Sequence, residues 1–390
     1  MAGSTFGNIL KITTWGESHG KALGVVIDGI PAGLKLSESD IQPYLDRRAP
    51  GKNSVSTPRK ESDEAEILSG VFEGVTTGCP ISIMVRNTSQ HSGDYDALRN
   101  LYRPGHADYT YDAKYGIRDH RGGGRSSGRE TLSRVAAGAV AMKVLKELGI
   151  DICSYTMSLG PVSIDKGRFN RDLIASLPTC MPDAEADSRA VAYIDKLRSE
   201  CDSCGGVIET VISGMPVGIG NPVFDKLSAD LAKATMSIGA CKAVEFGDGF
   251  KVAEAVGSDN NDEFGISDGQ IIKKTNHSGG LLGGMSDGSD IVIRNYFKPT
   301  PSIAKTQHTV KSEQTDSSKS TLHSGDNDPV YAKECKVVET DINIKGRHDP
   351  VIVPRAVVVV ECMCAITVLD AMLVNMGARL DRVIDFYRFI

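Results

Sequence analysis

Alternating apolar and polar residues predict strands that occur mostly as neighbouring pairs along the chain. The first pair is expected at residues 8–15 and 22–28, joined by a polar turn at 16–20. Strand–turn–strand patterns are expected at 68–85 and 205–217, and further strands at 243–246, 251–255, 290–297 and 335–344. Because the strands come in hairpins instead of alternating singly with helices, the pattern favours an α+β fold over a parallel α/β fold.

Apolar residues at helical spacing predict two long helices that are apolar on most of their sides. Ser127 and Glu130 have the spacing of a capping box, so the first helix should begin near Gly128 and end near Gly149. The second is expected at about 355–376, and shorter helices at 37–45 and 223–237. Helices of this kind are buried on several sides, which predicts a helical layer covered by antiparallel sheets.

A short repeat indicates that the sheet-forming unit occurs twice. Residues 70–80 match residues 206–216 at a constant offset, with identities at both ends in Gly70 and Gly206, and in Pro80 and Pro216. An internal duplication would give one domain over residues 1–390, built from two similar halves at about 1–150 and 151–390. Chance similarity between two hairpins is the alternative.

Composition restricts the classes of protein to be considered. The 390 residues are 40% hydrophobic and 24% charged, and the formal net charge of −6 argues against a general nucleic-acid binder. Nine cysteines, with no charged and apolar leader at the start, predict reduced thiols and a cytoplasmic protein. Cys201 and Cys204 form a C-x-x-C pair, but no second pair at zinc spacing accompanies it, so no metal site is expected. The longest uninterrupted apolar run, 356–360, is too short to span a membrane.

Basic residues are concentrated in one glycine-rich stretch before the first long helix. Five arginines surround the glycines at 122–124: Arg103, Arg118, Arg121, Arg125 and Arg129. A helix N-terminus favours a bound anion, and the guanidinium group matches phosphate and carboxylate oxygens, so we expect an anion site here. No G-K-[ST] follows the glycines, so the loop is not a Walker A loop. The alternative is a glycine-rich connector with solvated arginines.

Two polar segments are expected to be loops. The segment 46–60 is basic, with Arg47, Arg48, Lys52, Arg59 and Lys60, and could fold over an anion site or be a solvated run of charge. The segment at about 305–328 is poor in apolar residues and is expected to be a long flexible loop, for which we have no functional account.

Four motifs, taken together and in this order, resemble the signature of the chorismate synthase family. They are G-E-S-H-G at 16–20, R-P-G-H-A-D at 103–108, R-G-G-G-R-S-S-G-R-E-T at 121–131 and G-R-H-D-P at 346–350. The resemblance runs nearly end to end. It implies a homotetramer with a β-α-β sandwich fold that converts 5-enolpyruvylshikimate 3-phosphate to chorismate by 1,4-anti elimination of phosphate, in the shikimate pathway of aromatic amino acid biosynthesis. It also implies reduced FMN as a cofactor without net redox change, with NADPH only as a reductant.

The resemblance also implies roles for individual residues. His19 resembles the acid that protonates the leaving phosphate, His106 the histidine beside the flavin, and Asp349 the carboxylate near flavin N5. The arginines that match those holding the substrate's phosphate and carboxylates are Arg48, Arg103 and Arg129. The residues that match flavin contacts are Arg125, Ser126, Ser127, Gly239, Ala240, Gly283, Lys298, Pro299, Thr300, Pro301, Ser302 and Arg347. We expect a nearby anion to favour the protonated form of both histidines.

The sequence departs from the family pattern at two positions. Ser54 stands where many relatives carry an arginine, for which Arg59 or Lys52 could substitute, and Gly239 stands where some relatives carry an asparagine. A flavin-dependent oxidoreductase with the same anion-rich pocket is an alternative function, as is a non-enzymatic RNA or phosphopeptide binder, although the latter leaves His19, His106 and Asp349 unexplained. The sequence does not decide how the flavin would be reduced.

Overall fold

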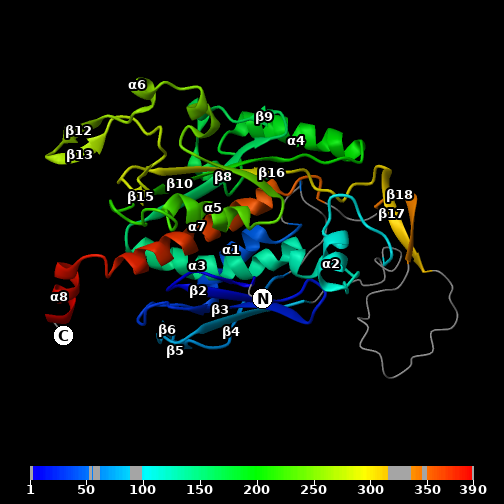
Figure 1. The fold of residues 1–390 in the computed structure, drawn as a ribbon, viewed down its shortest axis with the longest axis horizontal. Helices are drawn as coiled ribbons and strands as arrows, with labels where there is room; N and C mark the ends of the chain where they lie inside the picture. The colour runs from blue at the N-terminus through cyan, green and yellow to red at the C-terminus, as the bar shows by residue number, and fades with distance from the viewer. Residues whose placement is uncertain are drawn as a thin grey trace.

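Two five-stranded antiparallel sheets frame the computed structural model (Figure 1), which describes residues 3–51, 55, 62–87, 99–314, 335–344 and 349–388. The first sheet contains β1 (Thr5–Phe6), β2 (Lys11–Gly16), β3 (Ala22–Asp28), β7 (Ile81–Arg86) and β4 (Glu66–Ile67), in that order. The second contains β11 (Cys241–Phe246), β16 (Ile291–Phe297), β10 (Gly206–Ser213), β8 (Asp151–Leu159) and β9 (Val162–Ser163), in that order. Two-stranded pairs are formed by β5 (Val71–Phe72) and β6 (Val75–Thr76), β12 (Phe264–Ser267) and β13 (Gln270–Lys273), β14 (Leu281–Leu282) and β15 (Met285–Ser286), and β17 (Gln307–Gln314) and β18 (Cys335–Ile342).

Some of the helices, α3 (Thr131–Glu147) and α7 (Val353–Asn375) among them, lie between the two sheets in Figure 1, and their apolar side chains fill the space. The other helices are α1 (Glu38–Arg48), α2 (Asp108–Tyr115), α4 (Ala184–Ser199), α5 (Leu227–Met236), α6 (Gly257–Asn260) and α8 (Leu380–Arg388). Helix α3 packs on β2 and β3 of the first sheet, α7 packs on β8 and β10 of the second, and α3 and α7 pack on each other. The chain is therefore a mixed α/β protein in which helices pack against antiparallel sheets.

The contact between α3 and α7 is close because α3 presents small residues to α7. A Cβ atom added to Gly138 would lie 2.1 Å from Cβ of Cys362, so no larger residue fits without moving one helix. Among the described residues, α7 is the one helix long and apolar enough to cross a membrane, and 78% of that apolar window is buried inside the structure.

The two sheets share a recurring local geometry, but its register differs from the one that the sequence analysis proposed. Residues 70–80 form the β5–β6 hairpin and the turn after it, whereas 206–213 is the single strand β10, so that pairing joins unlike structures. The hairpin recurs as β14–β15 before β16, as β5–β6 precedes β7. Thr76 donates to the carbonyl of Pro31, and Ser286 donates likewise to Pro216. Residues 70–80 and residues 206–216 both contain glycines and β-branched residues. This shared composition is why a constant offset aligned a hairpin with a single strand.

Three predicted elements differ in the structure. Residues 251–255, expected as a strand, overlap the 3-10 turn Gly249–Ala253. The apolar side chains of this turn are exposed, and its backbone is not part of a described sheet. Part of the expected 305–328 loop is the strand β17, because its partner β18 comes from a distant part of the sequence; residues 315–328 lie outside the described residues. Residues Gly128–Glu130 form a 3-10 turn, and α3 begins at Thr131.

Candidate active site

The turn between β2 and β3 lies against the glycine-rich loop that precedes α3. A Cβ atom added to Gly122 would lie 2.5 Å from Cδ2 and 2.8 Å from Nε2 of His19, so the imidazole occupies the space that a side chain at 122 would need. Ser18 beside it is buried. Two of the four motifs, 16–20 and 121–131, therefore meet at His19.

Arg125 holds these two motifs together. Its guanidinium group donates to the carbonyl of Gly16 (3.0 Å), to the carbonyl of Thr14 (3.1 Å) and to the hydroxyl of Thr14 (2.6 Å). Ser126 donates to the carbonyl of Gly123 (2.6 Å), and the hydroxyl of Ser127 accepts from the amide of Arg129 (3.2 Å). The groups expected to contact a flavin phosphate thus also stabilise the loop itself.

Glu130 does not complete the capping box predicted with Ser127. Its buried carboxylate accepts from the hydroxyl of Thr14 (2.8 Å) and from Nε of Arg134 (2.8 Å) instead of returning to the backbone at 127. Glu130 therefore anchors the start of α3 to β2. Its hydrogen bonds to the side chains of Thr14 and Arg134 take the place of a bond to the local backbone amide.

A single buried carboxylate bridges two of the predicted substrate arginines. Oδ2 of Asp63 accepts from Nη2 of Arg48 at 2.9 Å, and Oδ1 of Asp63 lies 3.0 Å from Nη1 of Arg129. The side chains are 0%, 2% and 9% exposed for Asp63, Arg48 and Arg129. Burial, reinforced by the nearby Arg355, lowers the pKa of Arg48 to about 10, and Asp63 opposes that shift. We call these three residues the Asp63 cluster.

Further contacts extend the Asp63 cluster in both directions. Nε of Arg129 donates to Oδ1 of Asn87 (2.6 Å), whose Nδ2 donates to the carbonyls of Gly20 (2.7 Å) and Glu17 (3.1 Å) in the turn that carries His19. On the other side, Nε of Arg355 donates to the carbonyl of Arg48 (3.0 Å), and Nη1 of Arg355 pairs with Oδ2 of Asp349. A continuous network therefore links the turn of His19 to Asp349.

His106 belongs to a second cluster, formed with the 298–302 segment. Its Nδ1 donates to the carbonyl of Pro104 (3.0 Å), which leaves Nε2 as an acceptor for the hydroxyl of Ser302 (2.8 Å) in the neutral ring. Nζ of Lys298 donates to the carbonyl of Gly105 (2.9 Å). Burial, with Arg103 and Lys298 adding to it, lowers the pKa of His106 to about 4. Burial is the main cause of this shift and the neighbouring cations add to it; the effect of a nearby anion on the protonation of His106 stays a prediction.

Arg103, the third predicted substrate arginine, is held by Asp108 at the start of α2. Its Nε and Nη2 donate to the two oxygens of Asp108 at 2.8 Å each, and Nη1 of Arg118 lies 2.9 Å from Oδ1 of the same carboxylate. These arginines hold the pKa of Asp108 near 2 despite its burial. As with the Asp63 cluster, one carboxylate serves two arginines.

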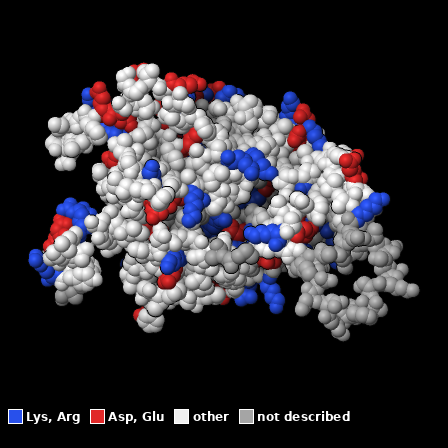
Figure 2. All heavy atoms as spheres, viewed as in Figure 1, with Lys and Arg blue, Asp and Glu red and all other residues white. Residues whose placement is uncertain are grey.

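A cavity of about 990 Å³ borders three of the four motifs. It is lined by Glu17 from the His19 turn, by Ala107, Asp108 and Arg118 around α2, and by the glycine loop from Gly122 to Ser126. Figure 2 shows Lys and Arg side chains gathered around the middle of one face of the molecule, although the net charge is −6. The basic character is thus local, as expected for an anion site.

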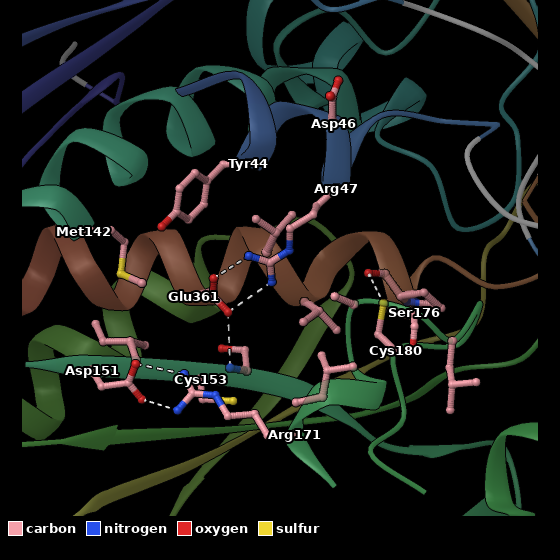
Figure 3. Close-up of a pocket in the computed structure, with 18 of the residues that line it drawn as sticks. Tyr44, Asp46, Arg47, Met142, Asp151, Cys153, Arg171, Ser176, Cys180 and Glu361 are labelled. Carbon is pink, nitrogen blue, oxygen red and sulfur yellow. Dashed lines mark hydrogen bonds and ion pairs between the residues drawn. The ribbon is translucent and has the colours of Figure 1, made fainter. Parts of the chain in front are cut away.

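A separate cavity of about 890 Å³ contains none of the predicted site residues (Figure 3). Arg47 of α1 reaches into it and donates to both oxygens of Glu361 on α7, at 2.7 and 3.1 Å. The adjacent Arg48 instead joins the Asp63 cluster. The consecutive arginines at the end of α1 therefore make ion pairs with different parts of the chain.

The remaining predicted residues are placed as follows. The amide of Lys298 donates to the carbonyl of Ala240 (3.0 Å), so Gly239 and Ala240 lie beside the 298–302 segment. Gly283 forms the turn between β14 and β15, and the described residues show no contact between it and another predicted site residue. Arg347, Ser54, Lys52 and Arg59 lie outside the described residues. The eight cysteines with described side chains are free thiols, including Cys201 and Cys204.

Three residues that hold the site together were not predicted from the sequence: Asp63, Asn87 and Arg355. Asp63 and Asn87 lie outside the four motifs, and their partners are distant in sequence. Arg355 carried a signal that could have found it, since it is a charged residue in the first turn of a mostly apolar helix, six residues after Asp349. A charge in such a position requires a partner.

Comparisons with known proteins agree with the motifs. The sequence profile of the family described as chorismate synthase matches residues 10–340 and 333–373. A chorismate synthase from Agathobacter rectalis is 56% identical over 388 residues, covering 100% of both chains, and one from Methanococcoides burtonii is 52% identical over 375 residues, covering 96% of both. A solved structure titled "Crystal Structure of Chorismate Synthase" superposes with a TM-score of 0.73 at 32% identity, covering 98% of this chain and 97% of that one.

Proposed function

This chain belongs to the chorismate synthase family, and we propose that the network from the His19 turn to Asp349 is its catalytic site. The enzyme is a lyase of the shikimate pathway: it eliminates phosphate and a ring hydrogen from 5-enolpyruvylshikimate 3-phosphate to give chorismate, a precursor of the aromatic amino acids. The observation that carries the proposed site is the continuity of that network, because it joins a candidate acid and a candidate base through substrate-binding arginines.

Substrate binding falls to Arg48, Arg103 and Arg129. The substrate carries a phosphate and two carboxylates, and such charge needs several cations and directed donors when it leaves water. Each of these arginines is already fixed by a carboxylate, Asp63 or Asp108, so it does not need to be ordered when the substrate arrives.

Proton transfer falls to His19 and Asp349, at the two ends of the network. His19 donates a proton to the leaving phosphate, and Asp349 helps to relay onward the proton that leaves the ring, with Arg355 fixing its carboxylate. His106 keeps Nε2 as a hydrogen-bond acceptor for Ser302, which orients its ring. The two histidines thus have different tasks.

Reduced FMN is the proposed cofactor, and the structure offers groups that suit it. The cavity has room for a flavin and is lined by Arg118, Arg125 and the backbone of the glycine loop, which match a phosphate. The hydroxyl of Thr300 is buried without a hydrogen-bond partner among the described residues, which leaves a polar group for a ligand. The residues proposed to hold the cofactor are those of the sequence analysis: Arg125, Ser126, Ser127, Gly239, Ala240, Gly283, Lys298, Pro299, Thr300, Pro301, Ser302 and Arg347. When bound, the reduced flavin supplies electron density to the substrate without net oxidation.

The finer points of architecture and context are part of the same proposal. The helical layer between two sheets and the recurring hairpin geometry support a β-α-β sandwich with two similar halves in one domain. Membership of the family supports a homotetramer in the cytoplasm, with NADPH acting only as a reductant of the flavin.

An anaerobic assay with 5-enolpyruvylshikimate 3-phosphate and chemically reduced FMN tests the proposal. Chorismate and phosphate should form in equal amounts while the flavin spectrum stays that of the reduced form. Substrate-driven oxidation of the flavin would instead indicate net hydride transfer and an oxidoreductase. No chorismate from a folded protein that binds flavin would refute the proposal.

A further inference from the structure

The Asp63 cluster brings two like charges together in a place that water hardly reaches. Arg48 comes from the end of α1 and Arg129 from the turn before α3, and their guanidinium groups meet only through the carboxylate of Asp63, at 2.9 and 3.0 Å. Two buried guanidinium groups without a counter-ion would repel each other and lose hydration. Asp63 therefore supplies the charge that allows the pair to exist.

The backbone at Asp63 is also specialised. Its φ of +46° lies in the left-handed region, which residues with a side chain seldom adopt, although Asp tolerates it better than most. The surrounding contacts must hold this conformation, and they include the two ion pairs and a hydrogen bond of 3.3 Å from Nε2 of Gln42 to the carbonyl of Asp63. The strain and the full burial together indicate that the carboxylate has one fixed position.

Arg48 keeps a donor that no residue in the described part of the chain uses. Its Nη2 is taken by Asp63, and its Nη1 makes only a long contact of 3.4 Å to the carbonyl of Gly128. Its Nε is buried and has no hydrogen-bond partner among the described residues. An unused buried donor on a fixed cation is a group that an anionic ligand can satisfy.

We propose that Asp63 is a positioning residue for substrate binding, which holds Arg48 and Arg129 as a pair so that both can act on the same anionic substrate. This inference rests on the proposed function, which assigns both arginines to the substrate. Asp63, like Arg48 and Arg129, lines neither of the two cavities described above, and it is the least exposed of the three side chains.

The test is Asp63→Asn, which keeps the size of the side chain but removes its charge. Arg48 and Arg129 contact different oxygens of Asp63, and in the carboxamide one of these becomes an NH2 group that faces a guanidinium donor, so one arginine should move. We expect KM for 5-enolpyruvylshikimate 3-phosphate to rise about tenfold or more while kcat stays within about threefold. The variant should weaken binding of the substrate and of the transition state equally, and the groups that transfer protons are unchanged. The inhibition constant of inorganic phosphate should rise in parallel. An unchanged KM would overturn the proposal, and a lowered KM would do so by showing that Asp63 competes with the substrate.

Asp183→Asn is the matched control. Asp183 is also buried and bonded to an arginine, Arg168 at 3.1 and 3.2 Å, but it caps α4 away from the site. The control should change neither KM nor the phosphate inhibition constant. A rise in KM as large as that of Asp63→Asn would show a general effect of removing a buried carboxylate and overturn the inference.

A second comparison covers the case in which Asp63→Asn does not fold. Arg48→Gln removes the repulsion, so Asp63 then pairs with Arg129 alone, and adding Asp63→Asn to Arg48→Gln should still raise KM about threefold or more. Equal KM values for Arg48→Gln and for the double variant would overturn the inference. Failure of the proposed function is recognised separately, because the unmodified enzyme would then make no chorismate. In that case, calorimetric titration of the unmodified protein and of Asp63→Asn with inorganic phosphate would still show whether Asp63 supports anion binding.

Discussion

The imidazole of His19 lies against the backbone of Gly122, so that a methyl group at position 122 would come within 2.5 Å of Cδ2 of the ring. The glycine is therefore required by the histidine, not by the turn. We expect Gly122→Ala to displace the ring and lower kcat about tenfold or more, because a misplaced proton donor loses its contribution to the transition state.

Gly128→Ala in the same loop is the control for this change. A Cβ atom at Gly128 would meet no atom within 4 Å, so its activity should stay close to that of the unmodified enzyme. Steady-state kinetics of both variants, with circular dichroism to confirm folding, provide the measurement. Equal activities of Gly122→Ala and the unmodified enzyme would contradict the placement of His19.

Gly138 in α3 and Cys362 in α7 set the distance between the two central helices. Gly138→Ala would place its Cβ 2.1 Å from Cβ and 2.6 Å from Cα of Cys362, and backbone atoms cannot give way as a flexible side chain does. We expect the free energy of unfolding to fall by about 2 to 3 kcal/mol, as for other overpacked cores. Urea denaturation measures this change, and Gly257→Ala, where the added Cβ meets nothing, should leave stability within about 0.5 kcal/mol. A Gly138→Ala protein of unaltered stability would show that the helices are not in this close contact.

His106 should make the folded protein sensitive to mild acid. Its pKa is about 4 in the folded chain, against about 6.5 in an unfolded one, because of burial and the neighbouring Arg103 and Lys298. Between these two pKa values the imidazole binds a proton in the unfolded chain but not in the folded chain. The free energy of unfolding therefore falls as the pH drops from 7 to 5. We expect the unmodified protein to lose about 1 to 2 kcal/mol more over this interval than His106→Gln does. Urea denaturation of the two proteins at pH 7 and pH 5 is the measurement, and identical losses would show that His106 does not titrate in this way.

Arg355 should matter for turnover although it lies outside the four motifs. It pairs with Asp349 through Nη1 and holds the carbonyl of Arg48 through Nε, so Arg355→Gln releases the carboxylate proposed to act on the ring proton. We expect kcat to fall about tenfold or more, with partial recovery in Arg355→Lys, which restores the charge but not the fork of donors.

The control for Arg355 is Arg379→Gln, which removes an arginine from an exposed ion pair with Asp381. Exposed pairs contribute little, so turnover should not change. If kcat of Arg355→Gln matched that of the unmodified enzyme, Asp349 would not depend on Arg355.

The local pattern was enough to predict most of the elements. Strand β3 was expected at 22–28 and is found at Ala22–Asp28, and α7 was expected at about 355–376 and is found at Val353–Asn375. Alternation and helical spacing are properties of neighbouring residues, so they can be recognised without the fold. The strand β17 was not recognised, because its polar sequence forms a strand only through pairing with β18.

The sequence by itself determined the family and the chemical groups, since four motifs supplied the histidines, the glycine loop, several arginines and Asp349. Only the tertiary structure decided what those groups do for one another. It paired Arg48 and Arg129 with Asp63, turned Arg125 toward the carbonyls of β2, and buried His106 beside cations, which lowers the pKa of its imidazole. The physical reason is that burial and ion pairing depend on which residues meet across long separations in the chain, and the spacing of residues within a motif carries no information about those encounters.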